Sequence, residues 1–370
     1  MKRIILVLFS IILLSPVYGQ KSVLKGIWWI EIKHGEPHLY LNSEKDRSGF
    51  NYGSSVDLES FDGYKTGNNV VFYIRREAGE IRFEGDIKQQ SGEGSYECII
   101  HQSYISEMEK LGYTDFEDKE YLLFLLKDFR VETLNRLADL GYEDIPSDKV
   151  MAIAVFGITP EFISEIKKAG FGNIKIQQVI SFKALNISLE DIREMKSLFG
   201  EDISIENIIS FKAMGINKEY ADEIRSTGLD IGPRNLISFK ALGITPGYIE
   251  DMKKSGIGEI NAENLPALKS QGVDIDFINE CRKLGFKDLD SGDLIRLKVF
   301  NLDKKYIDMI RNAGYKDASL EQILQFRVMD IDEKFIKKAR DFNDGVLPDP
   351  ERLIQMKASI EKPSSHLLHK

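Results

Sequence analysis

The sequence predicts an α+β fold in which a small antiparallel β-barrel or sandwich precedes an α-solenoid of about nine helical hairpins, each about 29 residues long. Short runs of alternating apolar and polar residues, separated by turn residues, predict the β part. Helically spaced apolar residues that return at a fixed interval predict the hairpins. We therefore divide the chain into residues 1–19, 20–102, 103–360 and 361–370.

Residues 1–19 have the pattern of a secretory signal peptide. Lys2 and Arg3 precede an apolar run at 4–14, and the small residue Gly19 follows. This run is shorter than the roughly 20 apolar residues that span a bilayer, so cleavage is favoured over membrane anchoring. We expect a periplasmic or secreted protein with no stable membrane insertion after cleavage. Residues 361–370 are expected to form a flexible tail.

Charge and cysteine content exclude several classes of protein. The net charge of −9 becomes −11 when the two positive charges of Lys2 and Arg3 are removed with the signal peptide. Such acidity disfavours general binding to nucleic acid or to anionic lipid. Cys98 and Cys281 are the two cysteines, far apart in the sequence, so a disulfide scaffold is excluded.

Residues 20–102 are rich in aromatic and β-branched residues, which predicts a meander of about six strands. The expected strands are 26–32, 38–41, 49–58, 70–75, 80–87 and 94–100. Small β modules can hold an apolar ligand at their mouth, which Trp28, Trp29 and Tyr40 could line; alternatively, these rings are ordinary core and surface residues. His34 and His38 have no carboxylate or cysteine cluster beside them, so we expect no metal.

The clearest hairpin copy covers residues 157–185. It begins with Gly-Ile-Thr-Pro, which returns at 243–246, and ends with Ser-Phe-Lys-Ala, which returns at 210–213 and 238–241. In the first helix of each hairpin an apolar column is formed by Met108, Leu137, Ile166, Met195, Ile224, Met252, Cys281, Ile310 and Ala339. A column in the second helix is formed by Leu126, Ile153, Phe182, Phe211, Phe239, Leu268, Leu297, Phe326 and Met356. Stacked hairpins would bury both columns against neighbouring copies.

Helix-capping residues separate these segments. Polar side chains that can accept from free backbone N–H groups precede the first helices, at Thr159, Ser188, Asn217, Thr245, Asp274, Asp303 and Asp332. Glycines that can supply a left-handed cap follow the same helices, at Gly112, Gly141, Gly170, Gly228, Gly256, Gly285 and Gly314. Second helices are capped by Ser204, Asn261, Asp290, Ser319 and Asp349. A one-residue shift at Phe199-Gly200 makes that turn irregular.

Two columns of basic residues accompany the hairpins. The first, called the basic column below, follows the second-helix apolar column and includes Lys183, Lys212, Lys240, Lys269, Lys298 and Arg327. The other lies in the first helices, at Lys167, Lys196, Arg225, Lys253, Arg282, Arg311 and Arg340. The basic column could bind an anionic partner, either a protein or an anionic polymer of the cell envelope. Alternatively, stacked copies simply inherit the same solvated residue, at little electrostatic cost.

No catalytic motif is present: we find no His-Glu-x-x-His, no phosphate-binding glycine loop and no Gly-x-Ser-x-Gly. We therefore expect a non-enzymatic binding scaffold without a cofactor. A small-ligand sensor, with the β module as receptor, and a hydrolase of unrecognised type are the alternatives. Gly-Ile-Thr-Pro between short helices also suggests a helix-hairpin-helix DNA module, which the expected export and the acidic charge disfavour.

Several segments together resemble a known family. These are Phe-Gly-Ile-Thr-Pro-Glu-Phe at 156–162, Ala-Gly-Phe at 169–171, Phe-Glu-Gly at 83–85 and Gly-Glu-Gly-Ser-Tyr at 92–96. They are similar to the extracytoplasmic extension of bacterial membrane zinc peptidases of the beta-lactam-sensor, antirepressor-cleaving type. Some members carry a small β module followed by many such repeats, and the likeness covers most of residues 22–345. This chain has neither the membrane helices nor the zinc motif of the family, so the resemblance implies a stand-alone sensing or scaffolding module without the proteolysis.

Overall fold

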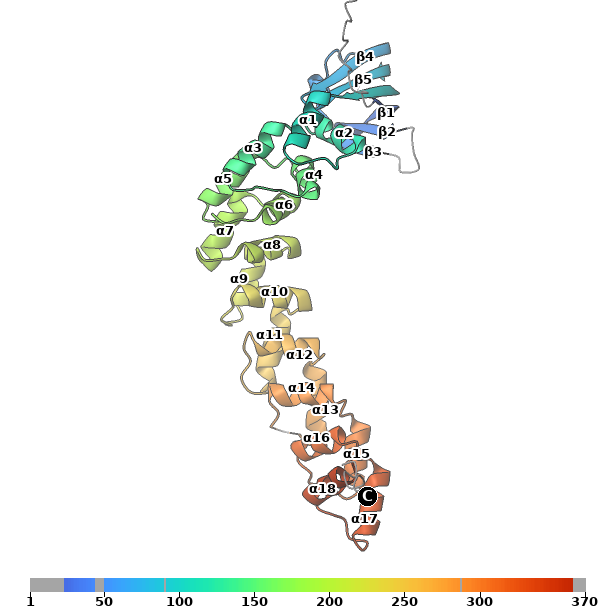
Figure 1. Ribbon diagram of the computed structural model, residues 1–370. Coiled ribbons are helices and arrows are strands. Elements are labelled where there is room, and N and C mark those ends of the chain that lie inside the picture. Colours follow the sequence, from blue (N-terminus) through green and yellow to red (C-terminus); the bar gives the residue numbers. More distant parts are fainter. Residues whose placement is uncertain (1–22, 44–49, 90, 287, 362–370) are drawn as a thin grey trace, which may run out of the picture. The chain divides into compact units, whose positions relative to one another are not determined.

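The computed structural model describes residues 23–43, 50–89, 91–286 and 288–361 (Figure 1). The expected signal peptide lies outside these residues, and so does the expected C-terminal tail except for its first residue, Glu361, which is helical. The chain divides into two compact units, residues 1–190 and 191–370. The first holds a β-sheet and six helices, the second holds eleven helices, and α7 (Leu189–Phe199) crosses the boundary between them. The α+β class is confirmed.

One antiparallel sheet of six strands begins the first unit, in the order β3-β2-β1-β6-β5-β4. The strands are β1 (Val23–Lys33), β2 (Glu36–Ser43), β3 (Asn51–Ser55), β4 (Gly67–Arg76), β5 (Gly79–Lys88) and β6 (Ser91–Ile100). Alternation along them places Trp28 and Ile30 on the buried face and Ile27 and Trp29 on the other. The prediction of about six antiparallel strands is confirmed.

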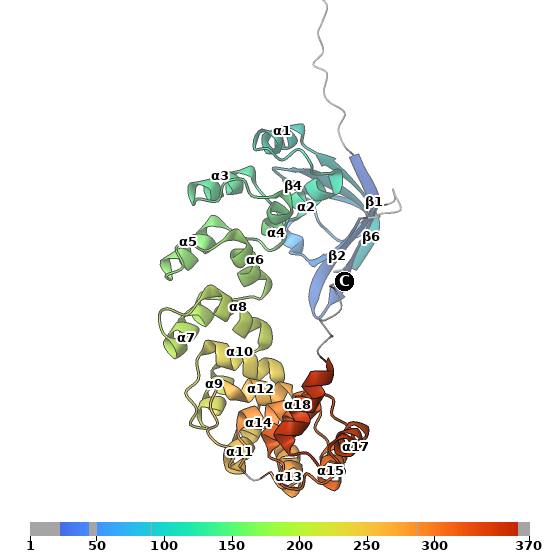
Figure 2. The same cartoon turned by 60° about the horizontal axis from the view of Figure 1, so that its bottom comes forward.

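The sheet is strongly curled. Trp28 of β1 and Phe72 of β4 have ring centroids 5.2 Å apart, although β6 and β5 lie between their strands. In a flat sheet three strand spacings of about 4.8 Å would separate these positions by about 14 Å. Phe61 and Phe83 join the same cluster, with centroids 4.7–6.0 Å from their neighbours. Helix α2 (Asp118–Leu126) packs on β4, β5 and β6 (Figure 2).

The sheet does not close, so the expectation of a closed barrel or a sandwich is wrong. Closure would require β3 to pair with β4. Instead, Asp62, which follows the 3-10 helix η1 (Leu58–Ser60), forms a β-bridge with Tyr73 on the free edge of β4, with two backbone hydrogen bonds of 2.9 Å. β3 has five residues against ten in β4, so it could not cover that edge. A short chain segment therefore protects part of an edge that would otherwise be exposed.

All described residues from 102 onwards that form regular structure are helical. The first unit contains α1 (Gln102–Lys110), α2, α3 (Val131–Asp139), α4 (Ser147–Val155), α5 (Pro160–Lys168) and α6 (Ile176–Ala184). The second contains α8 (Ile205–Met214), α9 (Lys218–Arg225), α10 (Pro233–Leu242), α11 (Pro246–Ser255), α12 (Asn264–Ser270), α13 (Ile275–Lys283), α14 (Ser291–Val299), α15 (Lys304–Asn312), α16 (Leu320–Val328), α17 (Glu333–Phe342) and α18 (Pro350–Glu361).

Even-numbered helices within a unit lie side by side. In the second unit α8, α10, α12 and α14 follow one another in this way (Figure 1), as do α2, α4 and α6 in the first. Odd-numbered helices also meet, for example α11 with α13. All nine residues of the predicted first-helix column are buried, and seven of the nine in the second-helix column. The exceptions, Leu126 and Met356, are half-buried.

The predicted capping residues are confirmed where the described hydrogen bonds include them. Thr159, Thr245 and Asp274 accept from the backbone N–H three residues later, and so do Asn217, Asp303 and Asp332. Ser204, Asn261, Asp290, Ser319 and Asp349 accept such bonds before the even-numbered helices. All seven predicted glycines have positive φ, such as 70° at Gly256 after α11.

Candidate interaction surfaces

The basic column lies on aromatic rings. Four lysine ammonium groups and one guanidinium stand 3.9–4.9 Å from the centroid of a ring on the preceding odd-numbered helix. The pairs are Lys183 with Phe162, Lys240 with Tyr220, Lys269 with Tyr248, Lys298 with Phe277, and Arg327 with Tyr306. A cation over a ring face is attracted by the ring quadrupole. The contacts therefore favour these side-chain positions, although all five side chains are half-buried or exposed.

Lys212 is the exception in this column. Asp191 stands in α7 where α5, α9, α11, α13 and α15 carry a ring, and its carboxylate accepts from Lys212 Nζ at 2.8 Å. The cation is thus held by an opposite charge instead of a π-face. Both kinds of contact hold the basic side chain against the helix before it.

These rings were missed in the sequence, although their spacing could have revealed them. The ring column is Phe162, Tyr220, Tyr248, Phe277, Tyr306 and Phe335, at intervals close to those of the basic column. Two of its hydroxyls also link elements, because Tyr248 donates to the Val273 carbonyl at 2.9 Å and Tyr306 to the Ile331 carbonyl at 3.0 Å. Burial raises the pKa of both phenols to about 12.

The second basic column has a different contact. Five of its members donate to backbone carbonyls near the end of the preceding odd-numbered helix. They are Lys167 (to Leu140, 2.6 Å), Arg225 (to Leu198, 3.0 Å), Lys253 (to Thr227, 2.6 Å), Arg282 (to Ser255) and Arg340 (to Ala313, 2.8 Å). The last carbonyls of a helix have no partner within it, and the helix dipole favours a cation there. This column therefore caps one helix with a side chain from the next.

An apolar stripe accompanies the basic column in the second unit. It consists of the residues at or just after the ends of four even-numbered helices: Met214, Leu242, Val299, Phe300, Val328 and Met329. Val328 is 61% exposed, Val299 57% and Phe300 36%, and the other three are half-buried. The two features touch, because Arg327 Nε donates to the Phe300 carbonyl at 3.1 Å. Equivalent positions in α12, Ser270 and Gln271, are polar and interrupt the stripe.

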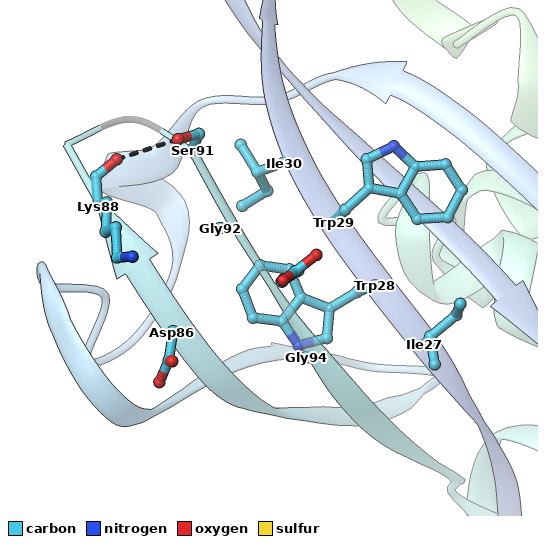
Figure 3. Close-up of a pocket in the computed structure, with 10 residues that line it drawn as sticks. Ile27, Trp28, Trp29, Ile30, Asp86, Lys88, Ser91, Gly92 and Gly94 are labelled. Carbon is cyan, nitrogen blue, oxygen red and sulfur yellow. Dashed lines mark hydrogen bonds between the residues drawn. The ribbon is translucent and has the colours of Figure 1, made fainter.

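Trp28 is held inside the sheet by three glycines. Its indole Nε1 donates to the Glu84 carbonyl at 3.3 Å, and the side chain is 1% exposed. Gly92 and Gly94 of β6 lie beneath the indole (Figure 3), and a Cβ on Gly92 would stand 3.1 Å from it. Gly94 pairs with Gly85 of β5, where any side chain would strike backbone atoms. The Phe-Glu-Gly and Gly-Glu-Gly-Ser-Tyr segments thus form the space that Trp28 fills.

Trp29 and Tyr40 lie on the opposite face of the sheet from Trp28. They pair directly across β1 and β2, and their rings stack at 5.0 Å with an interplanar angle of 7°. Tyr40 leans over Gly53 of β3, where an added Cβ would stand 2.9 Å from the ring. The structure therefore brings Trp29 and Tyr40 together and separates both from Trp28. The three do not line one mouth.

A depression of about 660 Å³ lies beside these tryptophans, between β1 and the β5–β6 hairpin. Figure 3 shows Asp86 and Lys88 on one side of it and Trp28 and Trp29 directed to opposite sides of β1. The rest of the lining is formed by Ile27, Ile30, Ser91, Glu93, Gly92 and Gly94. The depression is open and has both apolar and polar lining groups, and Asp86 is engaged in accepting the Asn69 backbone N–H at 2.9 Å.

Within the described residues no group of three or more His, Cys, Asp or Glu side chains could hold a metal ion. Cys98 and Cys281 are buried free thiols, and burial raises their pKa values to about 12 and about 11. Such thiols are poor nucleophiles at neutral pH. The longest described helix has 12 residues, and none has the length and apolar character needed to cross a membrane.

Comparison of the chain with models of protein families and with curated proteins finds no match.

Proposed function

We propose that the protein is an exported, non-enzymatic scaffold whose tandem helical hairpins bind an acidic segment of another envelope protein. The same cap, ring, cation and buried apolar residue return at intervals of 28 or 29 residues, which supports the tandem arrangement. The signal-peptide pattern of residues 1–19 supports export.

The observation that carries this proposal is the apolar stripe beside the basic column. Val299, Phe300 and Val328 expose apolar side chains at equivalent positions of successive even-numbered helices. Isolated exposed apolar residues are ordinary, whereas a line of them next to fixed cations is typical of a surface that binds a partner.

The ring contacts make the basic column suited to binding. A free lysine loses about 0.5–1.5 kcal/mol of side-chain entropy when a partner immobilises it. Lys298 already lies 3.9 Å from the Phe277 ring, and Arg327 is held by both Tyr306 and the Phe300 carbonyl. Part of that entropy is therefore lost on folding, and an anionic partner would meet an ordered row of charges.

The stripe favours a protein partner over a polyanionic polymer. A uniformly charged polymer would use the cations and leave Phe300 and Val328 uncovered. An acidic segment with interspersed apolar side chains would cover both features, and burying each apolar side chain contributes about 1.5–3 kcal/mol. The resemblance to the extension of sensor peptidases is consistent with a module that contacts other proteins.

The test is binding by stripe variants. A partner captured from envelope extract with the mature protein is identified, and its affinity is then measured by titration calorimetry. Phe300→Glu and Val328→Glu place a carboxylate where an apolar contact is expected, so each should weaken binding at least about tenfold, or 1.4 kcal/mol.

Asn279→Glu is the matched control, because Asn279 is exposed on α13, outside the stripe, and gains the same charge. It should bind within about twofold of the wild type. Full binding by both stripe variants would refute the proposal, and equal loss in the control would indicate a general charge effect. A polymer partner would retain binding in the stripe variants and lose it at high salt.

Small-ligand sensing by the β module is the second candidate function. The depression of about 660 Å³ and the stacked Trp29–Tyr40 pair support it. Trp29→Ala in the full chain separates the candidates, because it would abolish ligand binding by the β module and leave partner binding by the stripe unchanged.

A further inference from the structure

A cavity of about 490 Å³ lies at the last pair of described helices, α17 and α18. It is lined by Phe335, Lys338, Ala339 and Phe342 of α17 and by Arg352, Met356, Lys357 and Ser359 of α18. None of these residues belongs to the apolar stripe defined above. Figure 1 shows the two helices at the C-terminal end of the described chain.

The charges that line this cavity have one sign. Lys338, Arg352 and Lys357 surround it, and its lining contains no carboxylate. Lys338 and Arg352 are exposed and form no ion pair within the described residues. The neighbouring depression along α15 and α17 differs, because Asp308, Glu333 and Asp341 accompany its lysines and arginine. The cavity at α17 and α18 is therefore complementary to an anion.

Part of the cavity lining is apolar. Phe335, Ala339, Phe342 and Met356 supply two rings, a methyl group and a flexible thioether. Phe342 is 81% exposed, the largest exposure among the described large apolar side chains. Met356 is half-buried, unlike most of its column. Methionine adapts its shape to apolar ligands, so this part of the lining suits an aliphatic chain.

The size of the cavity indicates a small ligand. Stable protein interfaces use about 20–30 residues on each side, whereas small-molecule sites enclose about 300–1,000 Å³. Eight lining residues and about 490 Å³ match the second class. We propose that this cavity binds a free medium-chain aliphatic carboxylate, with its chain on Phe335, Phe342 and Met356 and its head between Lys338 and Arg352.

The charge of its side chains argues against the chain's own C-terminal segment as the occupant. Residues 362–370 contain Lys362 and Lys370 and no Asp or Glu, so their side chains do not complement three cations. A second copy of the cavity is excluded for the same reason, because two cationic surfaces would repel each other.

The test is calorimetric titration of the full chain with sodium decanoate, each probe being kept below its critical micelle concentration. Decanoate should bind with one-to-one stoichiometry. Decyl maltoside, with a neutral head, and decyltrimethylammonium, with a cationic one, should bind at least about tenfold more weakly. Arg352→Glu and Phe342→Ser should each weaken decanoate binding at least about tenfold. Lys334→Glu is the control, because Lys334 is exposed on α17 outside the cavity and undergoes the same charge reversal.

Three outcomes would overturn the assignment. Equal affinity for the neutral and anionic probes would show that the cations play no part. Unchanged binding by Arg352→Glu and Phe342→Ser, with circular dichroism confirming that both fold, would place the ligand elsewhere. Tighter binding by a chain ending at Glu361 would show that the C-terminal segment occupies the cavity. Retention of decanoate by the Phe300→Glu variant is expected, so this test and the partner test can fail independently.

Discussion

Replacing Gly94 with alanine should destabilise the first unit strongly. The added Cβ would stand 2.0 Å from the Glu84 carbonyl oxygen and 2.7 Å from the Gly85 Cα. Both are backbone atoms, so β5 and β6 must separate. Overpacking of this kind costs about 1–3 kcal/mol. Movement of Glu84 also weakens its hydrogen bond from Trp28, which contributes about 0.5–1.5 kcal/mol. We expect the free energy of unfolding to fall by about 2–4 kcal/mol.

Tryptophan fluorescence during urea unfolding measures this effect in the full chain. Trp28 and Trp29 are the two tryptophans of the protein and both lie in β1, so the signal reports the sheet alone. With a slope near 2 kcal/mol per molar urea, the midpoint should fall by about 1–2 M. Gly172→Ala is the control, because an added Cβ there meets no atom within 4 Å. Equal midpoints for the two variants would show that Gly94 does not hold the strands together.

Two tyrosines give a matched pair of variants. Tyr248→Phe removes a hydrogen bond to the loop before α13, so the free energy of unfolding should fall by about 1 kcal/mol, whereas Tyr220→Phe should change it little, because the Tyr220 hydroxyl is buried without a partner. Thermal unfolding measures both variants. Burial raises the pKa of Tyr248 from 10.0 to about 12. The neutral Tyr248 phenol should therefore contribute fully to stability below pH 10, and this contribution should be lost between pH 10 and 12 as the phenol ionises. Unfolding midpoints measured across that range would detect the loss. Arg340→Met should lower stability by about 1–2 kcal/mol in denaturant titrations, because it removes the cap on α15. Iodoacetamide at pH 8 should modify Cys98 at least about a hundredfold more slowly in the native protein than in urea, as mass spectrometry can quantify.

Local features of this fold could be read from the sequence. A capping side chain acts within three residues, so Thr159, Thr245 and Asp274 could be assigned from their neighbours alone. The two apolar columns could also be predicted from the sequence, because the same apolar position returns several times along the chain. Met356 is only half-buried for a local reason: it lies in the last described helix, and no further described helix packs on it.

The sequence could not show in this way that the sheet stays open. It depends on which segment reaches the free edge of β4, and that segment is the one around Asp62. The bridge from Asp62 to Tyr73 joins residues that have no distinctive sequence pattern. The curvature that brings Trp28 to Phe72 likewise results from the whole sheet.

The sequence alone could have excluded a ligand mouth that contains both Trp28 and Trp29. Adjacent residues on a strand face opposite sides of a sheet, so Trp28 and Trp29 could not share one mouth once β1 was assigned. To predict that Trp29 pairs with Tyr40, by contrast, one must also know the register of β1 and β2. The ring column required a search for repeated residues about 21 positions before each basic residue.

The positive sign of the basic column follows from folding whether or not the protein binds an anion. A ring face attracts a cation and would repel a carboxylate, so Lys298 is explained by Phe277 alone. Replacing Lys298 would therefore change packing and charge together and could not separate stability from binding. Phe300 and Val328 are different, because they are 36% and 61% exposed and their full burial is not needed for the fold. If their glutamate variants keep the wild-type free energy of unfolding and lose the partner, the apolar stripe is the binding surface. If binding falls only as far as the unfolded fraction rises, the stripe is part of the fold and the partner binds elsewhere.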